Sequence, residues 1–329
     1  MRLRIAALSL IVLAASAAAQ PASERIGIID FYGYGTLDLA QLRAALPFKE
    51  GDAVPSTEAI QAAEEALVKL TGRAAAKIKR VCCLEDGRST IFFGLAEPEA
   101  PPVRYNPEPT GELKLPKEAH RLFTQLEKDT IAAIKKGDSR EDDSEGYALM
   151  KNPEARGDQL KIRDWVRSNT ATTFRVLETS RSAEERADAA EALGYAERSP
   201  EQIAALVRAS FDAKDGVRDN AIRALEVLCN LGAEVTRRIP VARFVPMLHS
   251  LDWTDRNKAG LLFLMLSESR DPAVLDALRA GALVPLREMA QWRDWGHAAF
   301  AAILLARIAG IPDDQVTPSK VSEMLKTVQ

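Results

Sequence analysis

A helix-forming stretch from Asp215 to Leu228 constrains the fold most, because the chain repeats it. Its apolar residues recur at three- and four-residue steps and predict one buried helix face: Val217, Ala221, Ala224, Leu225 and Leu228. Asp215 is the predicted N-cap, since a carboxylate there accepts free amide hydrogens at the positive end of the helix dipole. One such helix cannot bury its own apolar face, so it needs neighbours of the same kind.

The pattern returns at intervals of 32, 38 and 42 residues, a spacing typical of repeats that contain two helices each. Arg186–Leu193 aligns with Arg218–Leu225, and Arg256 continues the series. In the last two repeats, Asp252-Trp253 aligns with Asp294-Trp295. The second helix of a repeat is predicted to begin where a cap residue precedes a proline, as at Ser199-Pro200, Asp271-Pro272 and Thr317-Pro318.

Residues 183–329 resemble HEAT-type repeats, with Val217-Arg218 and Ala221–Leu225 as the most specific match. The resemblance implies an all-α solenoid, in which stacked helix pairs bury a continuous core and expose an extended surface. Residues 117–182 are predicted to be a helical lead-in that caps these repeats. They contain a helix over Lys117–Lys136, an acidic loop over 137–146 and a long helix from near Pro153 to Leu177.

The first 19 residues have the pattern of a secretory signal peptide. A basic start over Met1–Arg4 precedes an apolar run over Ile5–Ala15 and small residues over Ser16–Ala19. The apolar run is shorter than the ~20 residues that span a bilayer, which argues against a membrane anchor. The sequence therefore predicts export, cleavage near Ala19, and a periplasmic or secreted protein that is not integral to the membrane.

Residues 20–97 predict a small α+β domain. Arg25–Gly33 is a predicted strand, and Leu37–Leu46 and a segment from Ser56 to Gly72 are predicted helices. Val81–Leu84 and Thr90–Leu95 are predicted strands around Asp86-Gly87, a dipeptide typical of hairpin turns. The predicted order is β-α-α-β-β.

The stretch from Ile26 to Glu97 resembles a POTRA domain, a periplasmic module of outer-membrane assembly and polypeptide-secretion proteins. The resemblance rests on a first strand that ends at Gly33, on Leu46 followed by Gly51-Asp52, and on a last strand that ends at Glu97. The chain departs from the pattern at Tyr34, where the family often has Asn, and at a shortened turn, Gly72-Arg73. An unrelated α+β domain of the same order is the alternative. A POTRA domain implies partner binding through a sheet edge.

Residues 98–116 are predicted to be a semi-rigid linker because they are rich in proline, at positions 98, 101, 102, 107, 109 and 116. Past the predicted cleavage site the chain has 42 basic and 47 acidic residues, a net charge of −5. A mildly acidic chain without a dense basic patch binds nucleic acid poorly, so no nucleic-acid partner is predicted.

The sequence contains no motif of a known catalytic or cofactor site. Its three histidines, His120, His249 and His297, do not lie at metal-ligand spacing. We therefore predict no catalytic residue, no metal and no cofactor. Two alternatives stay open: an enzyme or lyase-like HEAT protein that handles a cofactor or chromophore, and a self-associating structural protein.

Aromatic residues are the candidate partner-binding residues. Trp253 and Trp295 recur at one repeat position, Trp292 lies one helical turn earlier, and Phe92 points away from its strand's core face by alternation. Exposed aromatics of this kind act as interface hot spots, whereas packing between repeats or on the solenoid is the alternative. Of the cysteines, Cys229 either bridges Cys82 or Cys83 or is a small buried hydrophobic residue.

These observations predict a non-catalytic interaction scaffold of the periplasm or cell envelope. The solenoid surface, and a sheet edge of the small domain, would bind an envelope or secreted protein.

Overall fold

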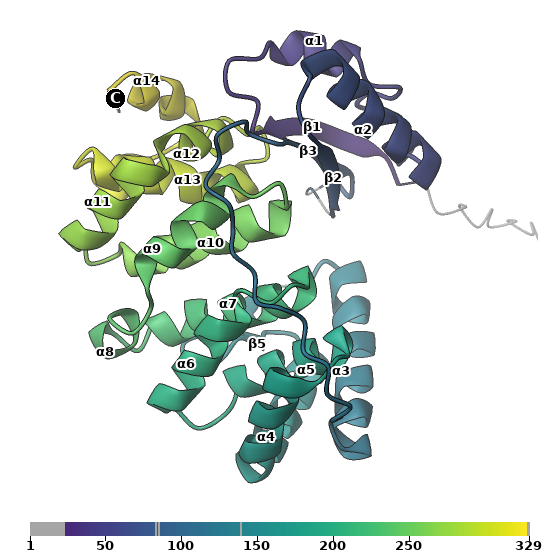
Figure 1. Ribbon diagram of the computed structural model, residues 1–329, viewed down its shortest axis with the longest axis vertical. Helices are drawn as coiled ribbons and strands as arrows, with labels where there is room; N and C mark the ends of the chain where they lie inside the picture. The colour runs from purple at the N-terminus through teal and green to yellow at the C-terminus, as the bar shows by residue number, and fades with distance from the viewer. Residues whose placement is uncertain (1–23, 83, 85, 139, 328–329) are drawn as a thin grey trace, which may run out of the picture.

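A small sheet with two helices comes first in the chain, and a much larger helical region follows it (Figure 1). The computed structural model describes residues 24–82, 84, 86–138 and 140–327. The predicted signal peptide, residues 1–19, lies outside the described residues. Within the described residues, no helix combines the length and the apolar character needed to span a bilayer.

The N-terminal unit, residues 24–97, has the predicted β-α-α-β-β order: β1 (Ile26–Tyr32), α1 (Leu39–Ala44), α2 (Thr57–Thr71), β2 (Ala76–Val81) and β3 (Ser89–Leu95). The strand order in the sheet is β1-β3-β2, with β1 parallel and β2 antiparallel to β3. Ser56 caps α2 by accepting from the Ala59 amide, and Gly72 ends it in the left-handed conformation. The predicted three-stranded sheet is therefore confirmed.

The second strand was misplaced by the sequence pattern. Val81–Leu84 was the predicted strand, whereas β2 spans Ala76–Val81. β2 is an edge strand that carries Lys77, Lys79 and Arg80, and charged residues on an edge strand prevent pairing with other chains. A search for apolar runs misses a strand of this kind.

The helical region begins with α3 (Lys117–Lys135), a short hairpin of β4 (Glu141–Asp142) and β5 (Leu149–Met150), and the long α4 (Pro153–Thr179). Helices α4, α5, α7, α10 and α13 then pack side by side in succession. The bounds of the later elements are α5 (Ala183–Gly194), α6 (Pro200–Ala209), α7 (Asp215–Cys229), α8 (Ala233–Thr236), α9 (Val241–Phe244), α10 (Trp253–Leu266), α11 (Pro272–Gly281), α12 (Leu283–Met289), α13 (Trp295–Ile308) and α14 (Val321–Thr327). This arrangement is compatible with a helical solenoid.

Two predicted helix starts differ from the structure. Asp215 is the first residue of α7 rather than its cap, and the cap residue Lys214 makes no side-chain capping bond. Ser199 and Asp271 do cap α6 and α11. After Thr317, however, the chain forms a short 3-10 turn over Pro318–Lys320 before α14 begins. The turn separates Thr317 from α14, so Thr317 does not cap that helix.

A row of buried arginines connects the repeats. Arg186, Arg218 and Arg256, which the sequence aligns, are among the largest fully buried side chains. Each guanidinium donates to the carbonyl six residues earlier, over 2.9, 2.9 and 2.6 Å, at Ser180, Asp212 and Ser250. Each arginine therefore fixes the turn that leads into its own helix.

Each of these arginines also pairs with a carboxylate from outside its own repeat. Asp212 accepts two bonds from Arg186, at 2.7 and 2.8 Å, and Asp255 accepts one from Arg218 at 2.7 Å. For Arg256 the carboxylate is Glu97, at 2.5 Å, from the end of the N-terminal unit. The N-terminal unit thus supplies the carboxylate that pairs with Arg256.

The linker, residues 98–116, runs from the N-terminal unit across α10, α7 and α5 to the start of α3 at the opposite end (Figure 1). It bonds to successive repeats on the way. Tyr105 donates to Asp255 at 2.5 Å, and the Asn106 amide donates to the carbonyl of Phe211 at 2.6 Å. The Leu115 amide donates to Glu185 at 2.8 Å. The linker is therefore fixed along the helical region at several points.

Gly111 is a point of close backbone approach in the linker. Its amide donates to Thr179 and its carbonyl accepts from Arg181, at 2.8 and 2.7 Å. A Cβ at this position would lie 2.5 Å from the Thr179 carbonyl oxygen, closer than van der Waals contact allows.

Replacing Gly111 with valine is expected to lower the free energy of unfolding by about 1–3 kcal/mol, because the backbone must shift to accept the side chain. Urea-induced unfolding measures the loss, and limited proteolysis of residues 98–116 shows whether the linker detaches. Thr110→Val, at the exposed neighbouring position, is the control and should change neither. Equal stability of the Gly111→Val protein would show that the linker does not hold the repeats.

Candidate functional site

The aromatic residues predicted from the sequence meet between the sheet and the helical region. Phe92, on β3, is fully buried, and its ring centroid lies 5.3 Å from that of Trp253 and 4.7 Å from that of Trp292. Trp253 and Trp292 are 8% and 5% exposed. Trp295 is partly buried against the same core. The structure thus places Phe92 on the helical region, which was one of its two predicted environments.

The outer edge of β1 is covered by the loop before α13. The Trp292 indole donates to the carbonyl of Phe31 at 2.9 Å, and Arg293 donates to the carbonyl of Ile29 at 2.7 Å. The edge of the sheet that remains is β2, where Glu64 accepts from the Ile78 amide at 2.9 Å. A sheet-edge partner would therefore have to add to β2.

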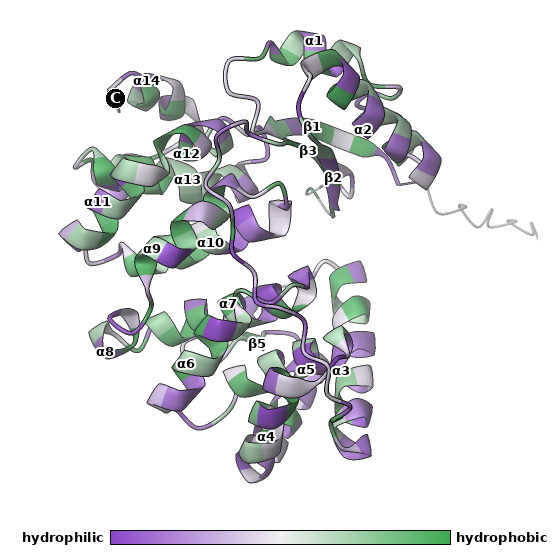
Figure 2. Cartoon of the chain, in the orientation of Figure 1, coloured by the Kyte–Doolittle hydropathy of each residue, from purple (hydrophilic) through white to green (hydrophobic). Residues whose placement is uncertain are grey.

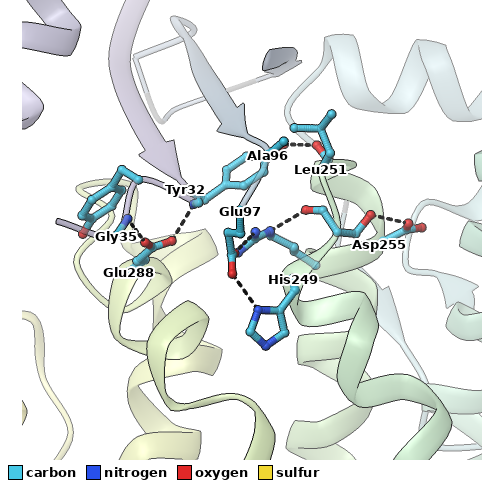
Figure 3. A network of polar contacts seen from close by, with 12 residues as sticks. Tyr32, Gly35, Ala96, Glu97, His249, Leu251, Asp255 and Glu288 are labelled. Atoms are coloured by element: carbon cyan, nitrogen blue, oxygen red, sulfur yellow. Dashed lines mark hydrogen bonds and ion pairs between the residues drawn. The ribbon is translucent and has the colours of Figure 1, made fainter. Parts of the chain in front are cut away.

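Glu288, on α12, holds the turn after β1. Its two carboxylate oxygens accept from the amides of Gly33 and Gly35, at 2.5 and 2.6 Å (Figure 3). Both glycines have positive φ, and the amides of these two alternate residues donate to one carboxylate. Burial raises the pKa of Glu288, and the two amides partly oppose this rise.

His249 lies close to the contact of Glu288 with the turn after β1. Each of its two ring nitrogens faces a hydrogen-bond acceptor. Nδ1 is 2.7 Å from Glu97 (Figure 3). Nε2 is 2.7 Å from the carbonyl of Gly281. Both acceptors are satisfied when both ring nitrogens donate, so this geometry favours an imidazolium. Burial lowers the pKa of His249, but the bonds to Glu97 and Gly281 outweigh it and the net shift is upward. Burial likewise raises the pKa of Glu97, and the His249 bond and Arg256 reverse that shift.

At pH 6, replacing His249 with glutamine is expected to lower the free energy of unfolding by about 1.5–3 kcal/mol, because one amide cannot replace both charged bonds. A histidine whose pKa is raised by folding stabilises fully below its unfolded pKa and loses this effect as the pH rises through the folded pKa. The difference between the wild type and the variant should therefore shrink from pH 6 to pH 9. Urea unfolding of both proteins across this range measures it, and a constant difference would contradict the imidazolium.

Cys229 is a free, buried thiol on α7 and forms no bridge to Cys82 or Cys83. It packs within the main core of the helical region, where burial raises its pKa to about 12. Of its two predicted states, the structure shows the small buried hydrophobic residue. Cys83 lies outside the described residues.

A groove of about 960 Å³ lies between α3, α5 and α7, and we call it the inner groove together with its continuation of about 360 Å³ along α10. The two parts share Glu141 and Arg223, which form an ion pair where they meet. Exposed and half-buried apolar side chains from α3 and α10 line it: Ile131, Ile134, Leu261, Leu264 and Met265.

Carboxylates gather in the inner groove beside these apolar residues. Asp188, Glu191 and Glu226 make no hydrogen bond or ion pair within the described residues, and Oε1 of Glu226 is fully buried. Burial, and then the charges of Glu191 and Glu184, raise the pKa of Asp188 to about 7. Burial also raises the pKa of Glu226 to about 7, against the attraction of Lys258. All three residues are half-buried, and partly buried carboxylates without hydrogen-bond partners are costly to a fold and indicate a candidate functional site.

The sequence analysis missed this groove, although the repeat alignment contains a signal for it. The spacing that aligns the buried arginines also aligns Glu191 with Arg223 and Leu261. It aligns Gly194 with Glu226 and Leu264 as well. All six positions are only partly buried, and the variation in their chemistry is the signal. Among the described residues, no group of three or more His, Cys, Asp or Glu is placed to hold a metal ion.

No protein-family model matches the chain, and no curated protein matches it. Among solved structures, it is similar to the crystal structure of an engineered protein, with 17% identity and a TM-score of 0.39. The match covers 65% of this chain and 95% of that one. A likeness of this size carries no argument about fold or function.

Proposed function

We propose that this protein is a non-catalytic interaction scaffold of the periplasm or cell envelope, which binds a partner protein in the inner groove. One observation carries the proposal. The groove combines exposed apolar side chains with half-buried carboxylates that have no partner within the described residues. Both features raise the free energy of the unoccupied protein, and a bound partner would relieve both.

The fold families of the helical region and of the N-terminal unit belong to the same proposal. The recurring arginines and the helix pairs support HEAT-like repeats, which use an extended surface to bind partners. The β-α-α-β-β order with a β1-β3-β2 sheet supports a POTRA-like N-terminal unit. The sequence pattern over residues 1–19 supports export. A second contact through a sheet edge would have to use β2, whose Lys77 and Arg80 are already paired with Asp252 and Glu24.

Site-specific photo-crosslinking in native envelope tests this proposal. A photoreactive residue at Ile134 places the crosslinker in the groove, where the wild-type side chain is 49% exposed. The same residue at Val284, on α12 and 56% exposed, is the matched control outside the groove. We expect a distinct envelope protein crosslinked from position 134 and absent from position 284. Equal crosslinking from both positions, or none from 134, would overturn the proposal.

A second candidate, acid–base chemistry, is favoured by one observation. A carboxyl group with a pKa of about 7, as at Asp188, suits proton transfer near neutral pH. Asp188→Asn separates the two functions. The variant is also tested for its ability to restore the phenotype of a strain that lacks the protein. If it still crosslinks the partner from position 134 but no longer restores that phenotype, the groove acts on a small molecule. If crosslinking and phenotype change together, it is a binding surface.

A further inference from the structure

The two helices that form the walls of the larger part of the inner groove differ in chemistry. Every α5 residue that lines it is a carboxylate, and α5 contributes no apolar side chain. The α3 wall has both hydrophobic and hydrophilic residues (Figure 2). It supplies the exposed apolar side chains of this part, Ile131 and Ile134, which are 44% and 49% exposed. The contrast therefore runs across the groove, from one wall to the other.

Most of the α5 carboxylates are not neutralised by the protein. Glu185 is satisfied, since it accepts from the Leu115 amide at 2.8 Å and lies 3.0 Å from His120. The other three, Glu184, Asp188 and Glu191, form no hydrogen bond or ion pair within the described residues. In all, six carboxylates and a single arginine line this part of the groove, and that arginine pairs with one of the six. The lining therefore has an excess of negative charge.

The continuation along α10 does not share this excess. Its lining has charges of both signs beside apolar side chains: Glu141, Asp143, Glu226, Arg223, Lys258, Leu261, Leu264 and Met265. Charge therefore selects an occupant in the larger part of the groove and not in the continuation.

From this contrast we infer that the larger part of the groove binds an amphipathic helix of the partner, with lysine or arginine side chains along one side of its apolar face. The inference rests on the proposed function and names the class of partner segment. Cationic side chains would pair with Asp188 and Glu191 of α5, and apolar side chains would cover Ile131 and Ile134 of α3. Charge complementarity thus turns the basic side of the bound helix towards α5.

A helix suits this groove better than an extended segment. The lining includes buried apolar side chains, Phe123, Leu126 and Met150, which cannot bond to a peptide backbone. A helix bonds its own backbone groups, whereas an extended segment would leave some of them unpaired against this surface.

The spacing of the carboxylates and the size of the groove also fit a helix. Glu184, Asp188 and Glu191 follow an i, i+4, i+7 spacing, which places them on one face of α5 over about two turns. A partner helix with cationic residues at the same spacing can meet all three. A helix of about 10 Å diameter fills roughly 120 Å³ per residue, so the volume of the larger part holds about eight residues, also about two turns.

A synthetic peptide of about 16 residues tests the inference, since shorter helices are marginal in water. It has lysines at i, i+4 and i+7, leucines on the adjoining face and alanines elsewhere. Fluorescence anisotropy measures its affinity for the full mature chain. Three peptides serve as comparisons: one with glutamates in place of the lysines, one with the lysines moved to the face opposite the leucines, and one with a central alanine replaced by proline. We expect the designed peptide to bind at least tenfold more tightly than each. Equal binding of any comparison peptide would overturn the inference.

Protein variants locate the binding. Asp188→Asn with Glu191→Gln should weaken binding of the designed peptide at least tenfold, and Ile134→Ser should weaken it with little change in salt dependence. Urea unfolding should show that these variants stay folded. The matched control is Glu197→Gln with Glu201→Gln, which removes the same charge at exposed positions outside the groove. A similar loss in the control pair would show that only net charge attracts the peptide, which would overturn the inference.

The two proposals fail separately. If position 134 crosslinks an envelope protein but the designed peptide does not bind, the scaffold function stands and the inferred class of partner segment is wrong. If the designed peptide binds as expected but no envelope protein is crosslinked, the groove recognises a basic amphipathic helix and the proposed function is wrong.

Discussion

Replacing Arg218 with alanine is expected to lower the free energy of unfolding by about 3–5 kcal/mol, one of the two largest losses we predict for a single substitution. Asp255 is 1% exposed and lies 2.7 Å from the Arg218 guanidinium. Without the arginine, the Asp255 carboxylate stays buried. It keeps the hydroxyl donors of Ser250 and Tyr105 but loses the cation that neutralises its charge. The carbonyls of Asp212 and Ala213 lose their donor as well.

Urea-induced unfolding measures the Arg218→Ala effect against a matched control. Arg208 forms an exposed ion pair with Glu178, so Arg208→Ala should cost only about 0–1 kcal/mol. The double variant Arg218→Ala with Asp255→Ala completes a cycle, and we expect a coupling energy of about 0.5–3 kcal/mol. Additive losses in the cycle would mean that the row of arginines fills space without depending on its carboxylates.

The helical part of this fold is predictable because its signal is local. Apolar residues recur with helical periodicity within single helices, and α4, α6 and α11 each begin with a proline in the first turn. Arg186, Arg218 and Arg256 were aligned from the sequence, but their burial was not predicted, since arginine is rarely buried without a partner. The partners Asp212 and Asp255 belong to neighbouring repeats, and Glu97 lies 159 residues from Arg256.

No comparable local pattern in the sequence predicts the contact between the N-terminal unit and α10–α13. This contact is formed by single residues from distant segments, such as Glu97, Glu288 and Trp292, none of which belongs to a periodic pattern. Strand alternation nevertheless predicted that Phe92 points away from the core of its own unit. The candidate groove was missed because the repeat alignment was used to find positions that are alike, whereas the groove is formed by aligned positions that differ.

Replacing Phe92 with alanine is expected to lower the free energy of unfolding by about 3–5 kcal/mol and to detach the N-terminal unit without unfolding it. Adjacent residues of β3 belong to two different cores. Phe92 is packed in the core of the helical region, whereas Phe93 belongs to the separate core beneath α1 and α2. The alanine therefore removes the ring that contacts Trp253 and Trp292 and leaves the unit's own core intact.

Phe93→Ala is the matched control for Phe92→Ala, since it deletes the same side chain, also fully buried, one position along the strand. Phe92→Ala should separate urea unfolding into two transitions and expose residues 98–116 to protease while the sheet stays folded. Phe93→Ala should unfold the sheet itself, so that β1–β3 become sensitive to protease at lower urea. Both variants leave the inner groove unaltered, because the groove lies between α3, α5, α7 and α10. If Phe92→Ala abolished partner crosslinking from position 134 while the helical region stayed folded, docking of the N-terminal unit would control binding in the groove.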